Sequence, residues 1–157
     1  QKLVAEMLFK WSNLLAADEN WIDAAAAARK AIAKSPGNAK YHYNLGVISK
    51  RLGDLQTAQE HYENAIDIDP GLISAHVNLA MILAKKKEWE KAEKHFRRVS
   101  RARPRDAEIF YNLGVALAEQ DKWQEASNQF RQALKIRPSF SQARKYLDRA
   151  TQNLKEE

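Results

Sequence analysis

The chain of 157 residues contains no cysteine. It therefore has no disulfide framework, no thiolate nucleophile and no cysteine-based zinc site, and its composition leaves the redox compartment open. It has no run of about 18 apolar residues, so we expect no membrane insertion by this chain. Glycine-rich phosphate loops, nucleophile elbows and HExxH motifs are also absent, and the carboxylates are scattered along the sequence. We expect neither catalysis nor a cofactor.

Proline is scarce, but its placement is regular. The four copies follow one another at a constant interval of 34 residues, as Pro36, Pro70, Pro104 and Pro138. Other residues recur in the same register: an alanine stands twelve positions before every proline, and the pentapeptide Tyr-Asn-Leu-Gly-Val occurs at 43–47 and again at 111–115. A fixed period with matching side chains indicates a repeat protein.

The repeat resembles the tetratricopeptide repeat (TPR). The match is best in the fourth repeat, at Phe110, Leu113, Gly114, Ala126, Phe130 and Pro138. The resemblance implies an all-α fold, a right-handed solenoid of helix-turn-helix repeats with small residues where two helices approach closely. The first repeat departs from the pattern, because Ala28 stands where an aromatic residue is expected. We expect looser packing around this repeat.

These patterns predict one TPR domain over residues 1–157, with repeats at 5–38, 39–72, 73–106 and 107–140 and a C-terminal capping helix at 141–157. The apolar spacing predicts helices at 3–16, 21–34, 39–52, 55–68, 73–86, 89–102, 107–120, 123–136 and 141–154. We expect the second helix of each repeat to begin at Trp21, Leu55, Trp89 or Trp123. Because the chain begins at Gln1 rather than methionine, we interpret it as a piece of a longer protein.

An asparagine ladder is the leading candidate for a binding site. In the TPR family the first helices of successive repeats line a concave groove, and the resemblance places Asn44, Asn78 and Asn112 on it. An amide both donates and accepts hydrogen bonds, so such a ladder can hold the backbone of an extended peptide without reading its sequence. This resembles the ladders of O-GlcNAc transferase and of the peroxisomal targeting-signal receptor. The alternative is that asparagine is simply common at this position of the repeat.

Apolar and basic residues flank the ladder positions. We expect Tyr43, Met81 and Tyr111 to contact apolar side chains of the partner, and Lys50, Arg51 and Lys85 to attract carboxylates, with Glu119 opposing them further along. The predicted function is therefore that of a scaffold that binds a protein or peptide partner in the groove.

Positive charge is concentrated in the second half of the chain. Residues 1–78 carry 8 Lys/Arg and 9 Asp/Glu, against 18 and 11 in residues 79–157. One cluster consists of Arg97, Arg98, Arg101, Arg103 and Arg105. Some of these arginines offset the dipole of the helix that they end. We expect the others to form a basic strip that binds an anionic partner. Nucleic acid is the lower alternative for this strip, because no aromatic residues are interleaved with the arginines as single-strand stacking would require.

The four histidines follow the repeat. His42 and His76 share one position of the unit, and His61 and His95 share another. Equivalent residues in neighbouring repeats lie about 10 Å apart, which is too far to share one metal ion. We expect no metal site.

Two further interpretations stay open. The chain is alternatively the substrate-recruiting or regulatory arm of a larger enzyme such as a glycosyltransferase, because residues 41–80 resemble repeats of O-GlcNAc transferase and of transmembrane TPR-containing O-mannosyltransferases. Self-association is the second, through an apolar helix face formed by Leu3, Val4, Met7 and Leu8. The sequence leaves the compartment undetermined: the cytoplasm is favoured, and the lumen of the endoplasmic reticulum is the alternative for a transmembrane TPR protein.

Overall fold

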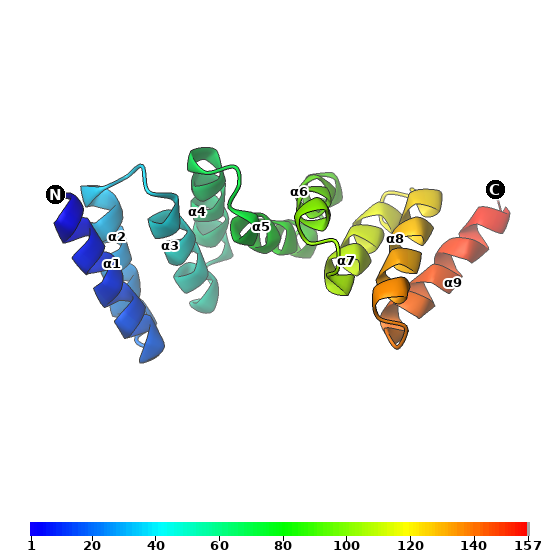
Figure 1. Cartoon of the computed structure of the whole chain (residues 1–157), viewed down its shortest axis with the longest axis horizontal. Coiled ribbons are helices and arrows are strands. Elements are labelled where there is room, and N and C mark those ends of the chain that lie inside the picture. Colours follow the sequence, from blue (N-terminus) through cyan, green and yellow to red (C-terminus); the bar gives the residue numbers. More distant parts are fainter. Residues whose placement is uncertain (157) are drawn as a thin grey trace. The chain divides into compact units, whose positions relative to one another are not determined.

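The computed structural model describes residues 1–156, and these residues form nine α-helices and no strand (Figure 1). The predicted all-α solenoid of helical hairpins is confirmed, and the helix ends lie within two residues of those predicted. The helices are α1 (Lys2–Ala17), α2 (Trp21–Lys34), α3 (Ala39–Arg51), α4 (Leu55–Ile68), α5 (Ile73–Lys85), α6 (Trp89–Ala102), α7 (Ala107–Ala118), α8 (Trp123–Ile136) and α9 (Ser141–Glu156). Residue 157 of the predicted capping helix lies outside the described residues.

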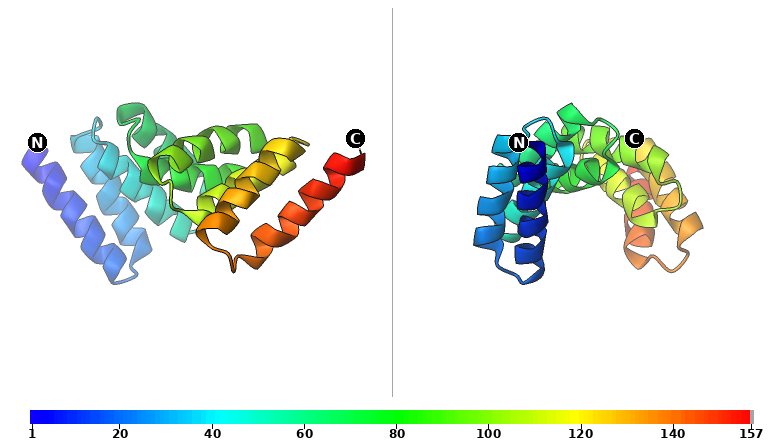
Figure 2. Two further views of the ribbon diagram at one scale, coloured as in Figure 1. Left: turned by 45° about the vertical axis from the view of Figure 1, so that its right-hand side comes forward. Right: turned by 60° about the vertical axis from the view of Figure 1, so that its left-hand side comes forward.

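The chain divides into two compact units, Gln1–Ala75 and His76–Glu157. In the first unit α1 packs against α2, α2 against α3, and α3 against α4. In the second unit α6 packs against α7, α7 against α8, and α8 against α9. Figure 2 shows consecutive helices joined by short turns within each unit. The single domain and the four repeat boundaries stay predictions.

The second helices begin where the sequence predicted. They open at Trp21, Leu55, Trp89 and Trp123. Two of these starts are capped by a side chain: Asn20 Oδ1 accepts a hydrogen bond from the amide of Asp23, and Asp54 Oδ1 accepts one from the amide of Thr57. Such caps satisfy amides that have no partner inside the helix.

The turn inside each helical hairpin contains one residue with a left-handed backbone conformation. Positive φ angles of 58°, 81°, 61° and 58° occur at Glu19, Gly53, Lys87 and Asp121. These four residues are 34 positions apart, so the same turn recurs in every hairpin. Only one of them is glycine, the residue that adopts this conformation without a steric penalty.

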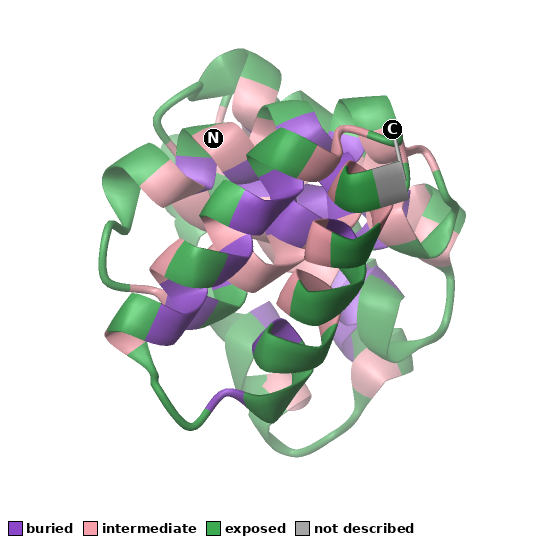
Figure 3. Cartoon of the chain, turned by 90° about the vertical axis from the view of Figure 1, so that its right-hand side faces the viewer, coloured by how far each residue is buried: buried purple, intermediate pink, exposed green. Residues whose placement is uncertain are grey.

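Small residues allow close helix contact, as expected. A Cβ atom added at Gly46 would lie 2.7 Å from the ring of Tyr62, and one added at Gly114 would lie 2.6 Å from the ring of Phe130. Both rings are fully buried. Figure 3 shows buried residues on the sides of helices that face neighbouring helices, and mostly exposed residues along the loops. The glycines therefore set the distance between the two helices of a hairpin.

Replacing Tyr62 by phenylalanine is expected to stabilise the chain. The hydroxyl of Tyr62 is buried and has no hydrogen-bond partner among the described residues. An unpaired buried hydroxyl costs about 1 kcal/mol or more, and phenylalanine already occupies the equivalent positions 96 and 130. Tyr62→Phe should therefore raise the free energy of unfolding by about 1 kcal/mol in urea titrations followed by circular dichroism.

The matched control for this prediction is Tyr146→Phe. The hydroxyl of Tyr146 hydrogen-bonds to Tyr111, so the same chemical change there should lower stability. Equal effects of the two substitutions would contradict the assignment of a partnerless hydroxyl to Tyr62.

Candidate functional site

Three asparagines occupy equivalent positions on α3, α5 and α7. Each is half-buried and begins a helix face at spacing i, i+3, i+7, which continues with an apolar residue and ends with a charged one. The faces are Asn44–Val47–Arg51, Asn78–Met81–Lys85 and Asn112–Val115–Glu119. Each face therefore offers an amide, an apolar contact and a charge in one line. The first face belongs to the first unit and the other two belong to the second.

In the first unit, Asn44 also has a structural role. Its Nδ2 donates to Ser12 Oγ at 3.2 Å, and Ser12 Oγ donates to the carbonyl oxygen of Ala24 at 2.8 Å. This chain of hydrogen bonds joins α3 to the α1–α2 hairpin. Half of the Asn44 amide is therefore committed to the fold, while its oxygen can still accept a hydrogen bond.

The other predicted residues of the first unit differ in exposure. The half-buried ring of Tyr43 lies 5.8 Å from the ring of Tyr62. Lys50 and Arg51 are exposed in the last turn of α3, and the Arg51 guanidinium lies 5.8 Å from the ring centre of Trp21. The two cations are therefore accessible, whereas Tyr43 contributes partly to packing.

In the second unit the structure brings two predicted residues together. Asn112 Nδ2 lies 3.6 Å from Met81 Sδ, and the Met81 side chain is 44% exposed. Lys85 is exposed one turn further along the α5 face. Asn78 is half-buried on the same face. Met81 is thus an open apolar side chain with an amide on either side of it.

Tyr111 is used mainly for packing. Its ring lies within about 6 Å of the rings of Phe130, Phe140 and Tyr146, at centroid distances of 6.1, 5.0 and 5.6 Å. Burial raises the pKa of Tyr111, and the neighbouring Tyr146 raises it further. Only part of this half-buried ring is left for a ligand.

The histidines form pairs that the sequence analysis missed. The repeat relates His42 to His76 and His61 to His95, whereas the structure pairs His42 with His61 and His76 with His95, at Nδ1–Nδ1 distances of 3.0 and 2.8 Å. The spacing of 19 residues, present twice, was the available signal. His42 Nε2 lies 3.0 Å from the carbonyl oxygen of Pro36, which can only accept. The neutral His42 ring therefore carries its proton on Nε2 and accepts from His61 at Nδ1.

Burial dominates the ionisation of these pairs. Burial lowers the pKa of His95 to about 4, with further contributions from His76 and Lys94. Burial also lowers the pKa of His61, with His42 acting in the same direction. Within residues 1–156 no group of three or more His, Asp or Glu side chains is arranged to hold a metal ion. We interpret the pairs as structural hydrogen bonds between the two helices of a hairpin.

Glu93 lies at the centre of an ionic network in the second unit. The residue is 8% exposed, and its carboxylate accepts hydrogen bonds from Arg97 Nε at 2.7 Å, Lys122 Nζ at 2.8 Å and Gln120 Nε2 at 2.9 Å. Burial raises the pKa of Glu93, but the hydrogen bonds from Lys122, Arg97 and Gln120 outweigh it and lower the pKa overall. The network joins α6 to the turn before α8.

The Glu93 network includes one member of the predicted arginine cluster. Arg97 forms ion pairs with Glu93 and Glu125. The remaining members, Arg98, Arg101, Arg103 and Arg105, are exposed at the end of α6 and in the turn that follows it. Arg97 is therefore held in ion pairs inside the fold, whereas the other four arginines are exposed at the surface.

Among residues 1–156, no helix combines the length and the apolar content that crossing a bilayer requires.

Comparison with known proteins gives a consistent family. Tetratricopeptide repeat models match residues 39–72 and residues 71–139. A comparison with curated protein sequences gives no match.

Solved structures share the fold at low sequence identity. MamA of AMB-1 has a TM-score of 0.87 and 16% identity, covering 98% of this chain and 84% of that one. MamA 41-end from Desulfovibrio magneticus RS-1 has a TM-score of 0.81 and 17% identity, covering 97% and 92%. YrrB, described as a TPR protein with an unusual peptide-binding site, has a TM-score of 0.77 and 24% identity, covering 88% and 72%. These structures show the shared fold. The two family models together span residues 39–139, and they show that the chain belongs to the tetratricopeptide repeat family.

Proposed function

We propose that the chain is a binding module that holds an extended segment of a partner protein against the asparagine-bearing faces of α5 and α7 in the second unit. Tetratricopeptide repeat proteins are generally non-catalytic interaction scaffolds, and the family match supports this general role. The peptide-binding site named for YrrB supports a peptide as the ligand for this fold.

The exposure of Met81 is the observation that carries the proposal. A large apolar side chain that is 44% exposed can gain free energy when a ligand covers it. The amide of Asn112 lies beside it, and Asn78 lies one turn before it on α5. Asparagine amides can bond the N–H and C=O groups of a peptide backbone while Met81 contacts an apolar side chain. This combination suits an extended segment.

The charges along these faces give a preference for the ligand. Arg51 and Lys85 end the faces of α3 and α5, whereas Glu119 ends the face of α7. Within the second unit we therefore expect the bound segment to carry a carboxylate near α5 and a neutral or basic residue near α7. In the first unit, Arg51 is the more specific contact for a carboxylate on α3, because arginine binds carboxylate with two parallel hydrogen bonds.

Alanine substitution of the ladder should weaken binding without unfolding the chain. Peptides selected from a random phage-displayed library against the whole chain would serve as ligands. Loss of one backbone hydrogen bond costs about 1 kcal/mol, so Asn78→Ala and Asn112→Ala should each weaken binding by about five- to tenfold in isothermal titration calorimetry. Met81→Ala should weaken it by a similar factor, because an apolar contact is lost.

The matched control is Asn128→Ala, which removes an exposed amide from the second helix α8. Its affinity for the same peptides should be unchanged. Asn44→Ala is a poorer test, because Asn44 also donates to Ser12 and its loss should lower stability. Selected peptides that bind Asn78→Ala, Asn112→Ala and Asn128→Ala equally well would overturn the proposed site.

A further inference from the structure

The outer side of α1 is an apolar face with no cover in the structure. Its residues follow one stripe of the helix at spacing i, i+1, i+4, i+8, i+11. They are Leu3, Val4, Met7, Trp11 and Leu14, with exposed fractions of 71%, 47%, 62%, 56% and 58%. We call this stripe the α1 face. It extends over about 17 Å at 1.5 Å per residue, which is the length of three helical turns.

Residues equivalent to those of the α1 face occur in α3 and α7, where they are buried. Met7, Trp11 and Leu14 stand at the positions of Tyr41, Leu45 and Ile48 in α3, and of Ile109, Leu113 and Ala116 in α7. The α3 residues are 6%, 0% and 1% exposed, and the α7 residues are 4%, 2% and 0% exposed. The α1 face therefore corresponds to a surface that is buried elsewhere in the same chain. The sequence pattern alone would have placed Trp11 in the core.

In the first unit, the equivalent surface of α3 packs against α2. Leu45 and Ile48 of α3 belong to one apolar cluster with Ala24, Ala25 and Ala28 of α2. Tyr41 belongs to another with Ala31 of α2. A large residue on one helix thus meets an alanine on the next. The surface that complements three large side chains on α1 is a helix with alanines at i, i+1, i+4 and i+7.

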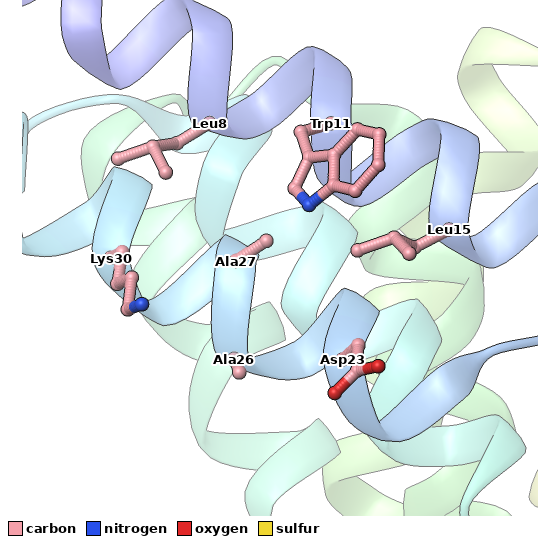
Figure 4. Close-up of a pocket in the computed structure, with 7 residues that line it drawn as sticks. All are labelled: Leu8, Trp11, Leu15, Asp23, Ala26, Ala27 and Lys30. Carbon is pink, nitrogen blue, oxygen red and sulfur yellow. The ribbon is translucent and has the colours of Figure 1, made fainter.

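A hollow beside Trp11 supports the same interpretation. A pocket of about 310 Å³ lies between α1 and α2, lined by Leu8, Trp11, Leu15, Asp23, Ala26, Ala27 and Lys30. Figure 4 shows the Trp11 ring between Leu8 and Leu15, with Asp23 and Lys30 on α2. Ala27 stands at the position of His61 and His95, whose rings pair with a neighbouring histidine in other hairpins. Its small side chain leaves this space open for a ligand.

We propose that the α1 face binds an amphipathic helix of a partner protein, whose contacting side carries alanines in the register found on α2. The geometry is that of a helix in an apolar groove, with Trp11 as the central anchor. This site shares no residue with the peptide-binding faces of α5 and α7.

A second copy of the chain fits this face less well. Pairing two α1 faces would set Met7, Trp11 and Leu14 against equally large side chains, without the alanines that allow close approach. The alanines of α2 that could supply them are already buried against α3. A lipid surface is also less suitable, because the charges next to the face are mixed: Glu6 pairs with Lys10, and both an acidic residue, Asp23, and a basic one, Lys30, line the adjacent pocket.

The test uses the chain's own covering helix as a probe. A fluorescein-labelled peptide with the sequence of residues 20–35, which contains α2, would be titrated with the whole chain and followed by fluorescence anisotropy. We expect saturable binding that is weakened at least about tenfold by Trp11→Glu and by Met7→Glu. Ile22→Ser changes a 73% exposed apolar residue outside the face and should leave binding unchanged. A peptide with glutamate in place of Ala24 and Ala28 should not bind.

Three other outcomes would overturn the proposal. The first is no binding of the residue 20–35 peptide by the unaltered chain. The second is a mass that doubles with concentration in light scattering and becomes monomeric in Trp11→Glu, which would assign the face to a second copy. The third is binding to phosphatidylcholine–phosphatidylserine vesicles that Trp11→Glu abolishes. Circular dichroism of both variants would confirm that their helices are intact, as expected for side chains more than half exposed.

Discussion

Lowering the pH from 6.5 to 4 is expected to reduce the free energy of unfolding through His95, by about 1–2 kcal/mol once the screening of this partly exposed ring by solvent is taken into account. Burial lowers the pKa of His95 to about 4, whereas histidine in an unfolded chain titrates near 6.5. Between these values the unfolded state binds a proton that the folded state does not. Acid therefore favours unfolding, and the contribution of His95 is fully present only above about pH 6.5.

The contact between the two rings explains why the folded state resists protonation. The Nδ1 atoms of His76 and His95 lie 2.8 Å apart, so one nitrogen must donate and the other must accept. A proton added to the accepting Nδ1 would place two N–H groups against each other. Lys94 adds a nearby positive charge. The His42–His61 pair has the same arrangement, so the lowered pKa of His61 should add to the loss of stability in acid.

The fourth repeat supplies a natural replacement for the pair. Phe110 and Gln129 stand at the positions of His76 and His95. The double variant His76→Phe/His95→Gln should therefore fold, and its stability should change less between pH 6.5 and 4 than that of the unaltered chain. Urea titrations at several pH values measure this difference. Identical pH profiles would show that the His76–His95 pair does not control acid stability, since carboxylates titrate alike in both proteins.

Most of the fold could be predicted from the sequence because it depends on local periodicity. The constant 34-residue interval and the apolar spacing placed the starts of α2, α4, α6 and α8 at the correct residues. The close approach at Gly46 and Gly114 was also foreseeable, because small residues recur at this position of the repeat. Each of these features repeats along the chain and can be recognised in it.

Features that depend on contacts between different positions of the repeat were not predicted. The pairing of His42 with His61 requires the relative rotation of α3 and α4, which no single position of the repeat reveals. The contacts of Glu93 with Gln120 and Lys122 cross 27 and 29 residues of sequence. Arg97 was assigned to a surface strip, although Glu93 and Glu125 hold it in ion pairs. These interactions depend on the packing of helices, which the sequence specifies only indirectly.

Gly114→Ala is expected to destabilise the chain by about 2 kcal/mol, although alanine is the better helix former. In an exposed helix this change would stabilise by about 1 kcal/mol. Here the new Cβ would lie 2.6 Å from Phe130, whose fully buried ring is confined by Tyr111 and Tyr146. Inserting a methyl group into such a packed site costs about 1–3 kcal/mol, so the steric term should decide the sign.

A double-mutant cycle separates the two terms. Phe130→Leu removes the ring that the Cβ would meet, at a cost of its own from lost packing. If the clash is the cause, Gly114→Ala should be harmless or stabilising in the Phe130→Leu background, giving a coupling free energy of about 2 kcal/mol. Gly37→Ala is the control for alanine substitution in open space, because a Cβ there meets no atom within 4 Å. Additive effects in the cycle would mean that α7 and α8 can move apart freely, and that Gly114 does not set their spacing.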